Sequence, residues 1–231
     1  MIVIVANRQD EVAAWLADRW QSSGPVLLTS ADLSASGWRH YLPPSRRSRA
    51  MIAAQSVVPE EITGVLTRIP CVYEQELGHI VPEDRSYVAS EMTAFLLAWL
   101  SSLTCPVLNS PTPACLAGPN LKSEQWVGLA ARLGIPVSPV RRSARLNSQE
   151  PARQSACEVI VVGDQCFGIA AQRFSTQCRL LAAAAGADLL AVQFASLEPG
   201  SPLVSANVWP NLASPEIADA VLNHLLRRPA C

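Results

Sequence analysis

The sequence predicts an α/β fold, with a parallel sheet first and a mixed α+β region after it. Apolar runs at residues 2–5 and 25–28 enclose a helical pattern, which is the β-α-β order typical of parallel strands. A long helical stripe over residues 86–103 leads into another short apolar run at 106–108. Further along, two β-rich runs are separated by Gly163-Asp164, a hairpin signal.

The composition is that of a folded protein with little net charge. The chain has 231 residues, enough for one large or two small domains, and 49% of them are hydrophobic. The net charge of −1 gives no basic field of the kind that binds nucleic acid. The N-terminus lacks the basic region of a signal peptide, and the longest apolar stretch, 94–100, is too short to cross a membrane. We therefore expect a cytoplasmic protein that binds neither nucleic acid nor membrane.

The cysteines and histidines show no metal-ligand spacing. The seven cysteines form no Cys-x-x-Cys pair, and the three histidines are scattered along the chain. Several cysteines flank apolar runs, where this residue usually serves as a small buried hydrophobe. We expect structural cysteines and no metal site.

The first half of the chain supplies the strands of the parallel sheet. A helix over residues 12–20 follows the first strand, and no Gly-x-Gly-x-x-Gly motif lies between them, which argues against a classical dinucleotide site. Residues 62–69 contain another strand, which ends near Arg68. Ser86 is the expected N-cap of the long helix that precedes the strand at 106–108.

An arginine cluster stands out in the loop predicted between residues 34 and 50. This loop contains the run Ser45-Arg46-Arg47-Ser48-Arg49. Arg46 and Arg47 are candidates for holding an anionic ligand or an acidic peptide. The alternative is a solvated loop, which is the usual role of such a charge run.

Residues 104–140 read as strand, loop, helix and strand. A breaker cluster closes the strand, and Ser123 is the expected N-cap of the helix. The helix has one apolar face, formed by Trp126, Leu129, Ala130 and Leu133. Gly134 stands where a helix ends, and an extended segment follows it.

After Val140 the chain becomes polar and then forms the last α+β elements. Residues 141–155 read as a linker or loop. We expect the two hairpin strands next, then a helix capped by Ser175, then strands at 188–194 and 203–207. A closing helix starts at Ser214, with a proline at its first position.

The segment around Lys122 resembles the start of an ATP-grasp ligase. The matching residues are Asn109 and Pro111 of an Asn-x-Pro turn, Lys122 at the head of a helix, and Gly134-Ile135-Pro136-Val137 after it. The hairpin Glu158–Phe167 is also similar to one in these ligases. The closest branch contains the RimK-type glutamate ligases and the graspetide (microviridin-type) peptide maturases.

This resemblance implies a domain organisation. Residues 1–110 would form a pre-ATP-grasp-like βαβ domain. Residues 111–231 would form a reduced ATP-grasp-like α+β core. The family carries a β-rich lid with a second lysine and a glycine-rich flap, whereas here residues 141–156 are too few for it and contain neither lysine nor glycine. We therefore expect a linker or loop in place of most of the lid subdomain.

The resemblance also assigns candidate site residues. Lys122, the only lysine of the chain, falls on the family's first nucleotide lysine, and Asn207 falls on the asparagine of its Glu-x-Asn-x-x-Pro segment. The alternative interpretation of Lys122 is a solvated surface charge with no ligand. The graspetide maturases have an arginine-bearing segment where Arg68 stands, so Arg68 is a candidate substrate contact, with capping of the sheet edge as the alternative.

Two of the family's metal ligands are missing. Gln193 stands where the family has an acid, and Ser205 stands where it has the glutamate of the Glu-x-Asn-x-x-Pro segment. Neither residue supplies the anionic oxygen that Mg²⁺ prefers. We therefore predict no catalytic residues, no metal and no required cofactor, with Lys122 and Asn207 left as a vestigial nucleotide site.

The functional prediction is an ATP-grasp-like protein that has lost ligase catalysis. It would serve as a binding or scaffold subunit in a peptide- or natural-product-modifying pathway such as RiPP biosynthesis. A protein or peptide partner is expected, together with a homo- or hetero-oligomer. The alternative is an active ATP-dependent carboxylate–amine or ester-forming ligase, using ATP and Mg²⁺ and completed by a partner chain. A third hypothesis is a site for an anionic small molecule around Arg46–Arg49.

Overall fold

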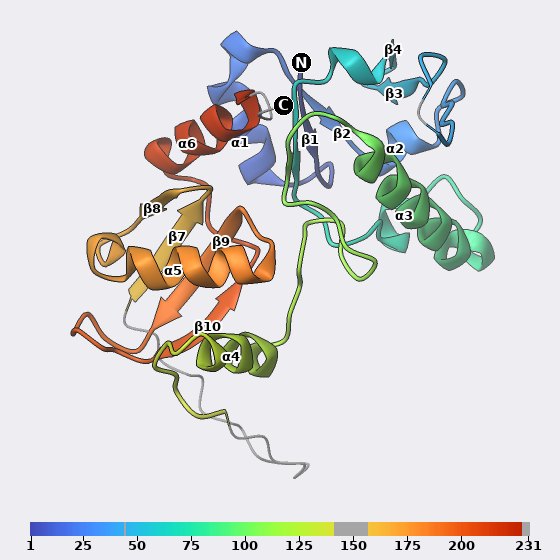
Figure 1. Cartoon of the computed structure of the whole chain (residues 1–231). Coiled ribbons are helices and arrows are strands. Elements are labelled where there is room, and N and C mark those ends of the chain that lie inside the picture. Colours follow the sequence, from blue (N-terminus) through green and yellow to red (C-terminus); the bar gives the residue numbers. More distant parts are fainter. Residues whose placement is uncertain (44, 141–156, 228–231) are drawn as a thin grey trace. The chain divides into compact units, whose positions relative to one another are not determined.

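The structure is a computed structural model that describes residues 1–43, 45–140 and 157–227 (Figure 1). The predicted linker at 141–156 lies outside the described residues. The chain divides into two compact units, one formed by Met1–Pro119 with Asn211–Cys231 and the other by Asn120–Pro210. Residues 111–119 and 211–231, expected in the second domain, thus belong to the first unit. The assignment of 1–110 and 111–231 as functional domains stays a prediction.

The first unit is built on the expected parallel sheet. Its strands are β1 (Ile2–Val5), β2 (Pro25–Leu28), β5 (Gly64–Thr67) and β6 (Val107–Leu108), in the order β2-β1-β5-β6. Every adjacent pair is parallel, and Ile2 is the register partner of both Pro25 and Gly64. All four residues of β1 are buried, as the continuous apolar run predicts for a strand covered on both faces.

Helices cover both faces of this sheet. They are α1 (Glu11–Arg19), α3 (Arg85–Ser102) and α6 (Pro215–Leu226). Val3 and Val65 share a core with Leu96 and Trp99 of α3, so the predicted stripe of that helix is confirmed. On the other face α6 approaches β5 so closely that a Cβ on Gly64 would lie 2.7 Å from the Leu225 carbonyl oxygen.

The loop region between β2 and β5 contains elements that the sequence did not reveal. These are a short helix α2 (Ser30–Leu33), a hairpin of β3 (Ala50–Ile52) with β4 (Gln55–Val57), and the 3-10 turn η2 (Pro59–Glu61). The hairpin turn consists of Ala53 and Ala54, both with positive φ. Alanine gives no turn signal, because glycine or asparagine normally occupies such positions. The other short turns of this unit are η1 (Gln21–Ser23), η3 (Glu74–Glu76) and η4 (Pro82–Asp84).

The second unit is an antiparallel sheet with helices on one face. Its strands are β7 (Cys157–Val162), β8 (Gln165–Phe167), β9 (Leu189–Phe194) and β10 (Leu203–Asn207), in the order β10-β9-β7-β8. The helices α4 (Ser123–Arg132) and α5 (Ala171–Ala185) share a core with this sheet. Val162 pairs with Gln165 across Gly163-Asp164, which confirms the two-residue hairpin.

Three predicted N-caps are wrong in position. Ser86 and Ser123 each lie inside the first turn, since the caps of α3 and α4 are Asp84 and Lys122. Ser175 is the fifth residue of α5, which begins at Ala171 without a polar cap. Packing explains this early start, because Phe174 is buried and stacks on Phe194 at a centroid distance of 4.1 Å.

The observed fold is thus mixed α/β, with one parallel and one antiparallel sheet, as expected in outline. No helix among the described residues is long and apolar enough to cross a membrane.

The approach of α6 to β5 gives a first prediction. Gly64→Ala places a methyl group against the Leu225 backbone, so we expect a loss of about 1–3 kcal/mol in the free energy of unfolding. Gly78→Ala is the matched control, because a Cβ there meets no atom within 4 Å. Urea denaturation of both variants measures the difference. Equal stability of the two would show that α6 does not constrain β5.

Candidate functional site

Strand pairing in the second unit aligns the positions that the resemblance assigns to the metal. Gln193 of β9 and Ser205 of β10 are register partners, so their side chains leave the same face of the sheet. Asn207 lies two residues beyond Ser205 and shares that face. All three side chains are half-buried. The opposite face carries the core, with Val192 and Ala206 beneath α4 and α5.

A carboxylate that is not among the predicted site residues lies beside Gln193 on the same face of the sheet. Glu158 of β7 is the register partner of Gln193, and the Gln193 Nε2 donates a hydrogen bond to Glu158 Oε2 at 3.2 Å. The signal available in the sequence was that Glu158 is the only charged residue of an otherwise apolar strand. We call Glu158, Gln193, Ser205 and Asn207 the polar row.

The polar row does not fit Mg²⁺ in its usual coordination. Mg²⁺ is normally bound through carboxylates and phosphates, and the row has one carboxylate, one of whose oxygens accepts from an amide. The Asn207 Oδ1 accepts a hydrogen bond from the Trp209 amide at 2.8 Å and is therefore engaged in a turn. Among the described residues, no group of three or more histidine, cysteine, aspartate or glutamate side chains could hold a metal ion.

Lys122 lies at the N-cap of α4 with an exposed side chain. Its backbone amide donates to Gln125 Oε1 at 2.8 Å, and no ion pair joins its ammonium to any residue in the described part of the chain. Helix N-termini carry partial positive charge and favour phosphate groups. Figure 1 shows α4 running antiparallel to β10, against which it packs, so its N-terminus lies toward the end of β10 that carries Asn207. The structure therefore brings the two predicted nucleotide residues to one end of the second unit.

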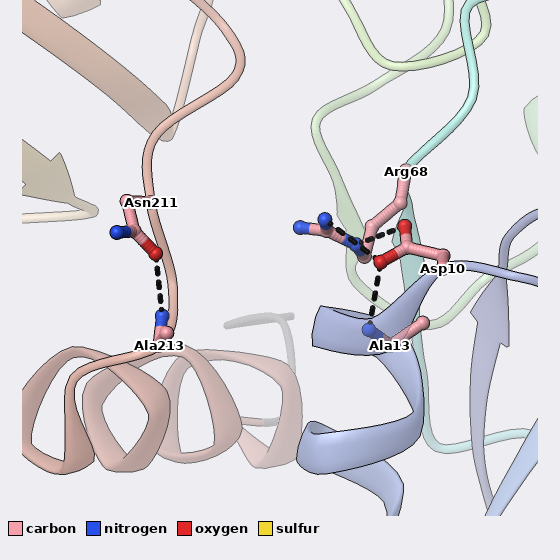
Figure 2. Close-up of polar contacts among 5 residues, drawn as sticks. All are labelled: Asp10, Ala13, Arg68, Asn211 and Ala213. Atoms are coloured by element: carbon pink, nitrogen blue, oxygen red, sulfur yellow. Dashed lines mark hydrogen bonds and ion pairs between the residues drawn. The ribbon is translucent and has the colours of Figure 1, made fainter.

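Arg68 lies at the carboxyl end of β5 in an ion pair with Asp10. Its Nε donates to Asp10 Oδ2 at 2.7 Å and its Nη2 donates to Oδ1 at 3.2 Å, and the two side chains are 19% and 16% exposed. Figure 2 shows the Asp10 carboxylate between the Arg68 guanidinium and the first turn of α1, where Oδ1 accepts from the Ala13 amide at 2.9 Å. The Arg68–Asp10 ion pair joins the end of β5 to the start of α1. A contact between Arg68 and a substrate stays a prediction.

Figure 2 also shows a side-chain-to-backbone hydrogen bond in the turn before α6, whose N-cap Ser214 makes no capping bond of its own. The Asn211 Oδ1 accepts from the Ala213 amide at 2.9 Å, just ahead of α6. Helices α1 and α6 are joined directly, because Arg19 pairs with Asp219 at 2.7 Å.

Arg46 lies near the amino ends of strands β5 and β6, whereas Arg68 follows the carboxyl end of β5. Arg46 and Arg47 are both exposed. Arg46 lines a cavity together with Glu60, just ahead of β5, and Thr104, just ahead of β6, and Arg47 is not part of its lining. Since Glu60 and Thr104 precede the strands and Arg68 follows one, Arg46 and Arg68 occupy different sites. Their predicted roles stay predictions.

The described cysteines are free thiols, and burial suppresses ionisation of several of them. Desolvation raises the pKa of the Cys178 thiol to about 12, and it also raises the pKa of Cys105, Cys115, Cys157 and Cys166. A thiol held neutral is a poor nucleophile and a poor metal ligand. Cys115, Cys157 and Cys178 are buried, and Cys105 and Cys166 are half-buried, so these thiols are held neutral by their surroundings.

Comparisons with known proteins place the fold. No protein-family model matches the sequence, and no curated protein matches it. Among solved structures, the macrocyclase MdnC from Microcystis aeruginosa MRC, bound with precursor peptide MdnA, has a TM-score of 0.69 and 13% identity over 98% of this chain and 100% of that one. The ATP-grasp ligase PsnB, complexed with minimal precursor, Mg and ADP, has a TM-score of 0.65 and 14% identity over 98% of both chains. The chain has the ATP-grasp fold.

A third structure extends the likeness to the other branch that the motifs indicate. The RimK domain ATP-grasp protein from Sphaerobacter thermophilus DSM 20745 has a TM-score of 0.55 and 15% identity over 98% of this chain and 99% of that one. The resemblance predicted from Lys122, the Gly134–Val137 segment and the 158–167 hairpin is thus confirmed at the level of the ATP-grasp fold. Identities of this size establish the fold and leave the activity to be argued from the residues.

The Asp10–Arg68 contact gives a second prediction. Asp10→Ala removes both the ion pair and the N-cap of α1, so we expect it to lower the free energy of unfolding by about 1–3 kcal/mol. Asp10→Asn keeps a capping oxygen and loses only the charge, so we expect less than half of that loss. Urea denaturation separates the two variants, and equal losses would show that the cap contributes nothing.

Cys178 gives a prediction of pH dependence. In the unfolded chain the thiol ionises near its ordinary pKa of 9.0, whereas in the folded chain it stays neutral up to about 12. Stability is therefore fully present below pH 9 and is lost as pH rises toward the folded pKa, by at most about 1.4 kcal/mol per pH unit. Cys178→Ala should lose stability less steeply than wild type between about pH 9 and pH 11 in urea denaturation. Parallel curves would contradict the buried, neutral thiol.

Proposed function

We propose that this ATP-grasp-fold protein binds a peptide or protein partner in a peptide-modifying pathway and does not itself catalyse ligation. The observation that carries the proposal is the polar row. Ligation through an acyl phosphate needs cationic and metal neutralisation of the transferring phosphoryl group. Gln193 and Ser205 are register partners at the two positions that the resemblance assigns to metal ligands, yet both are neutral.

The short segment between Pro139 and Cys157 supports the same proposal. Between Pro139 and Cys157 the sequence has too few residues for the several strands of a lid, and neither a lysine nor a glycine. We propose that the lid subdomain is reduced here and that the second unit is an ATP-grasp core without its triphosphate clamp. Lys122 and Asn207 then remain from a nucleotide site that has lost its other members.

A peptide partner is supported by what the similar structures contain. MdnC is bound with a precursor peptide, and PsnB is complexed with a minimal precursor. Peptide recognition does not need metal-bound nucleotide, so this part of the function can persist after ligation is lost. The partner would be a precursor peptide or the enzyme that modifies it, in a homo- or hetero-oligomer.

A second candidate is an active carboxylate–amine or ester-forming ligase completed by a partner chain. The observation in its favour is Glu158, whose carboxylate adjoins Gln193 where the family's acid is expected. Lys122 and Asn207 are also present. In this case ATP and Mg²⁺ would bind only in the assembled complex, with the partner supplying the missing charged groups.

Nucleotide binding by the isolated chain tests the proposal. We expect calorimetric titration with a non-hydrolysable ATP analogue and Mg²⁺ to show no saturable binding up to millimolar concentration, because Gln193 and Ser205 supply no anionic oxygen and Glu158 is the one carboxylate of the polar row. The double variant Gln193→Asp/Ser205→Glu restores two carboxylates. We expect it to bind the analogue in a Mg²⁺-dependent manner, with an affinity at least about tenfold higher than that of the wild type.

Two variants in α4 provide the controls. Arg132, in the last turn of the same helix, is the matched control for Lys122. Saturable wild-type binding that is lost in Lys122→Ala but kept in Arg132→Ala would overturn the proposal.

Glu158→Gln addresses the second candidate. It should abolish nucleotide binding by an assembled complex if the ligase is active, and it should leave peptide binding unchanged if the protein is a scaffold.

A further inference from the structure

A small cavity in the first unit, lined mostly by polar residues, is not used by the proposed function. Its volume is about 160 Å³, and it lies between the arginine-rich loop, the turn η2 and the segment that follows α3. Its lining includes His40, Ser45, Arg46, Ser48, Glu60 and Thr104. A volume of this size corresponds to roughly five water molecules at ~30 Å³ each, so it suits a ligand of only a few heavy atoms.

One buried polar atom at this cavity has no partner. The His40 Nε2 is fully buried and makes no hydrogen bond. Ser48, which also lines the cavity, is only 5% exposed. Buried polar groups are nearly always hydrogen-bonded, so groups without partners that border a cavity indicate a ligand or ordered water within it.

The cavity also presents two opposite charges that do not pair with each other. Arg46 comes from the arginine-rich loop and Glu60 from η2, and neither forms an ion pair with another described residue. A guanidinium suits a carboxylate, which it can bind through two parallel hydrogen bonds. A glutamate suits an ammonium group.

The charges decide the class of ligand. A simple anion would face Glu60 and also the C-terminal end of α3, whose last residue, Ser102, lines the cavity and carries the negative end of the helix dipole. A simple cation would face Arg46. A small molecule that carries both charges satisfies Arg46 with its carboxylate and Glu60 with its ammonium, while hydroxyls such as Ser48 bind the remaining oxygens.

We propose that this cavity binds a free α-amino acid with a small side chain, or a zwitterion of the same size. The site is independent of the nucleotide question, because it lies wholly in the first unit and shares no residue with the polar row. It also separates the two arginines of the loop, since Arg46 lines the cavity and Arg47 does not.

The test compares a complete ligand with its halves. The probe is free alanine. Acetate carries only its negative charge, and ethylamine carries only its positive charge. Calorimetric titration or saturation-transfer NMR measures the binding of all three compounds to the full chain. We expect alanine to bind at least about tenfold more tightly than either half. Acetate binding as tightly as alanine would replace the proposal with an anion site, and no alanine binding up to millimolar concentration would overturn it.

Four variants locate the site. Arg46→Met and Glu60→Gln remove one charge each and should weaken alanine binding about tenfold or more. Arg47→Met is the matched control and should bind as wild type does. Ser48→Val narrows the cavity and removes its hydroxyl, so it should also weaken binding. Thermal unfolding of each variant reports whether it is folded, and alanine binding that survives both Arg46→Met and Ser48→Val would place the ligand elsewhere.

Discussion

The register of β9 with its neighbours is the constraint on which the second unit depends. With Gln193 opposite both Ser205 and Glu158, the alternating side chains divide into an apolar face for α4 and α5 and a polar row on the other face. A slip by one residue would exchange the two sets and expose Val192 and its neighbours. The burial of the apolar face therefore fixes which side chains can meet at the site.

The first unit depends on close contacts at both ends of β5, an inner strand of its parallel sheet. At Gly64 the absence of a side chain lets α6 pack directly on β5. At the other end of the same strand, Arg68 binds the Asp10 carboxylate that caps α1. Segments from residue 10, residue 68 and residues 215–226 are thus joined around one short strand, which is why the C-terminal helix belongs to this unit.

The basic candidates differ in how far the protein itself satisfies their charge. The Arg68 guanidinium is paired and largely buried, so its main documented contact is structural. Lys122 and Arg46 have exposed charges that no ion pair satisfies among the described residues, and each lies beside groups suited to a ligand. A cation without a partner is available for binding, whereas breaking the Arg68 pair for a ligand would leave Asp10 buried without its counter-ion.

The sequence by itself determined the order of the elements and the fold family. Apolar periodicity, turn glycines such as Gly134 and Gly186, and the motif around Lys122 are local signals, and the structure bears out the strands, the 163–164 hairpin and the ATP-grasp fold. The β3–β4 hairpin could not be predicted, because its alanine turn carries no local signal. The start of α5 was predicted at the wrong residue, because the packing of Phe174 outweighs the preference for a polar cap.

Only the tertiary structure decided which polar groups meet. Glu158 lies 35 residues before Gln193, and strand pairing alone brings their side chains into contact. Arg68 and Asp10 are separated by 58 positions, and the cavity at Arg46 assembles from a loop, a turn and the end of a helix. Such contacts depend on register and packing between distant segments, and no local pattern of residue types records them.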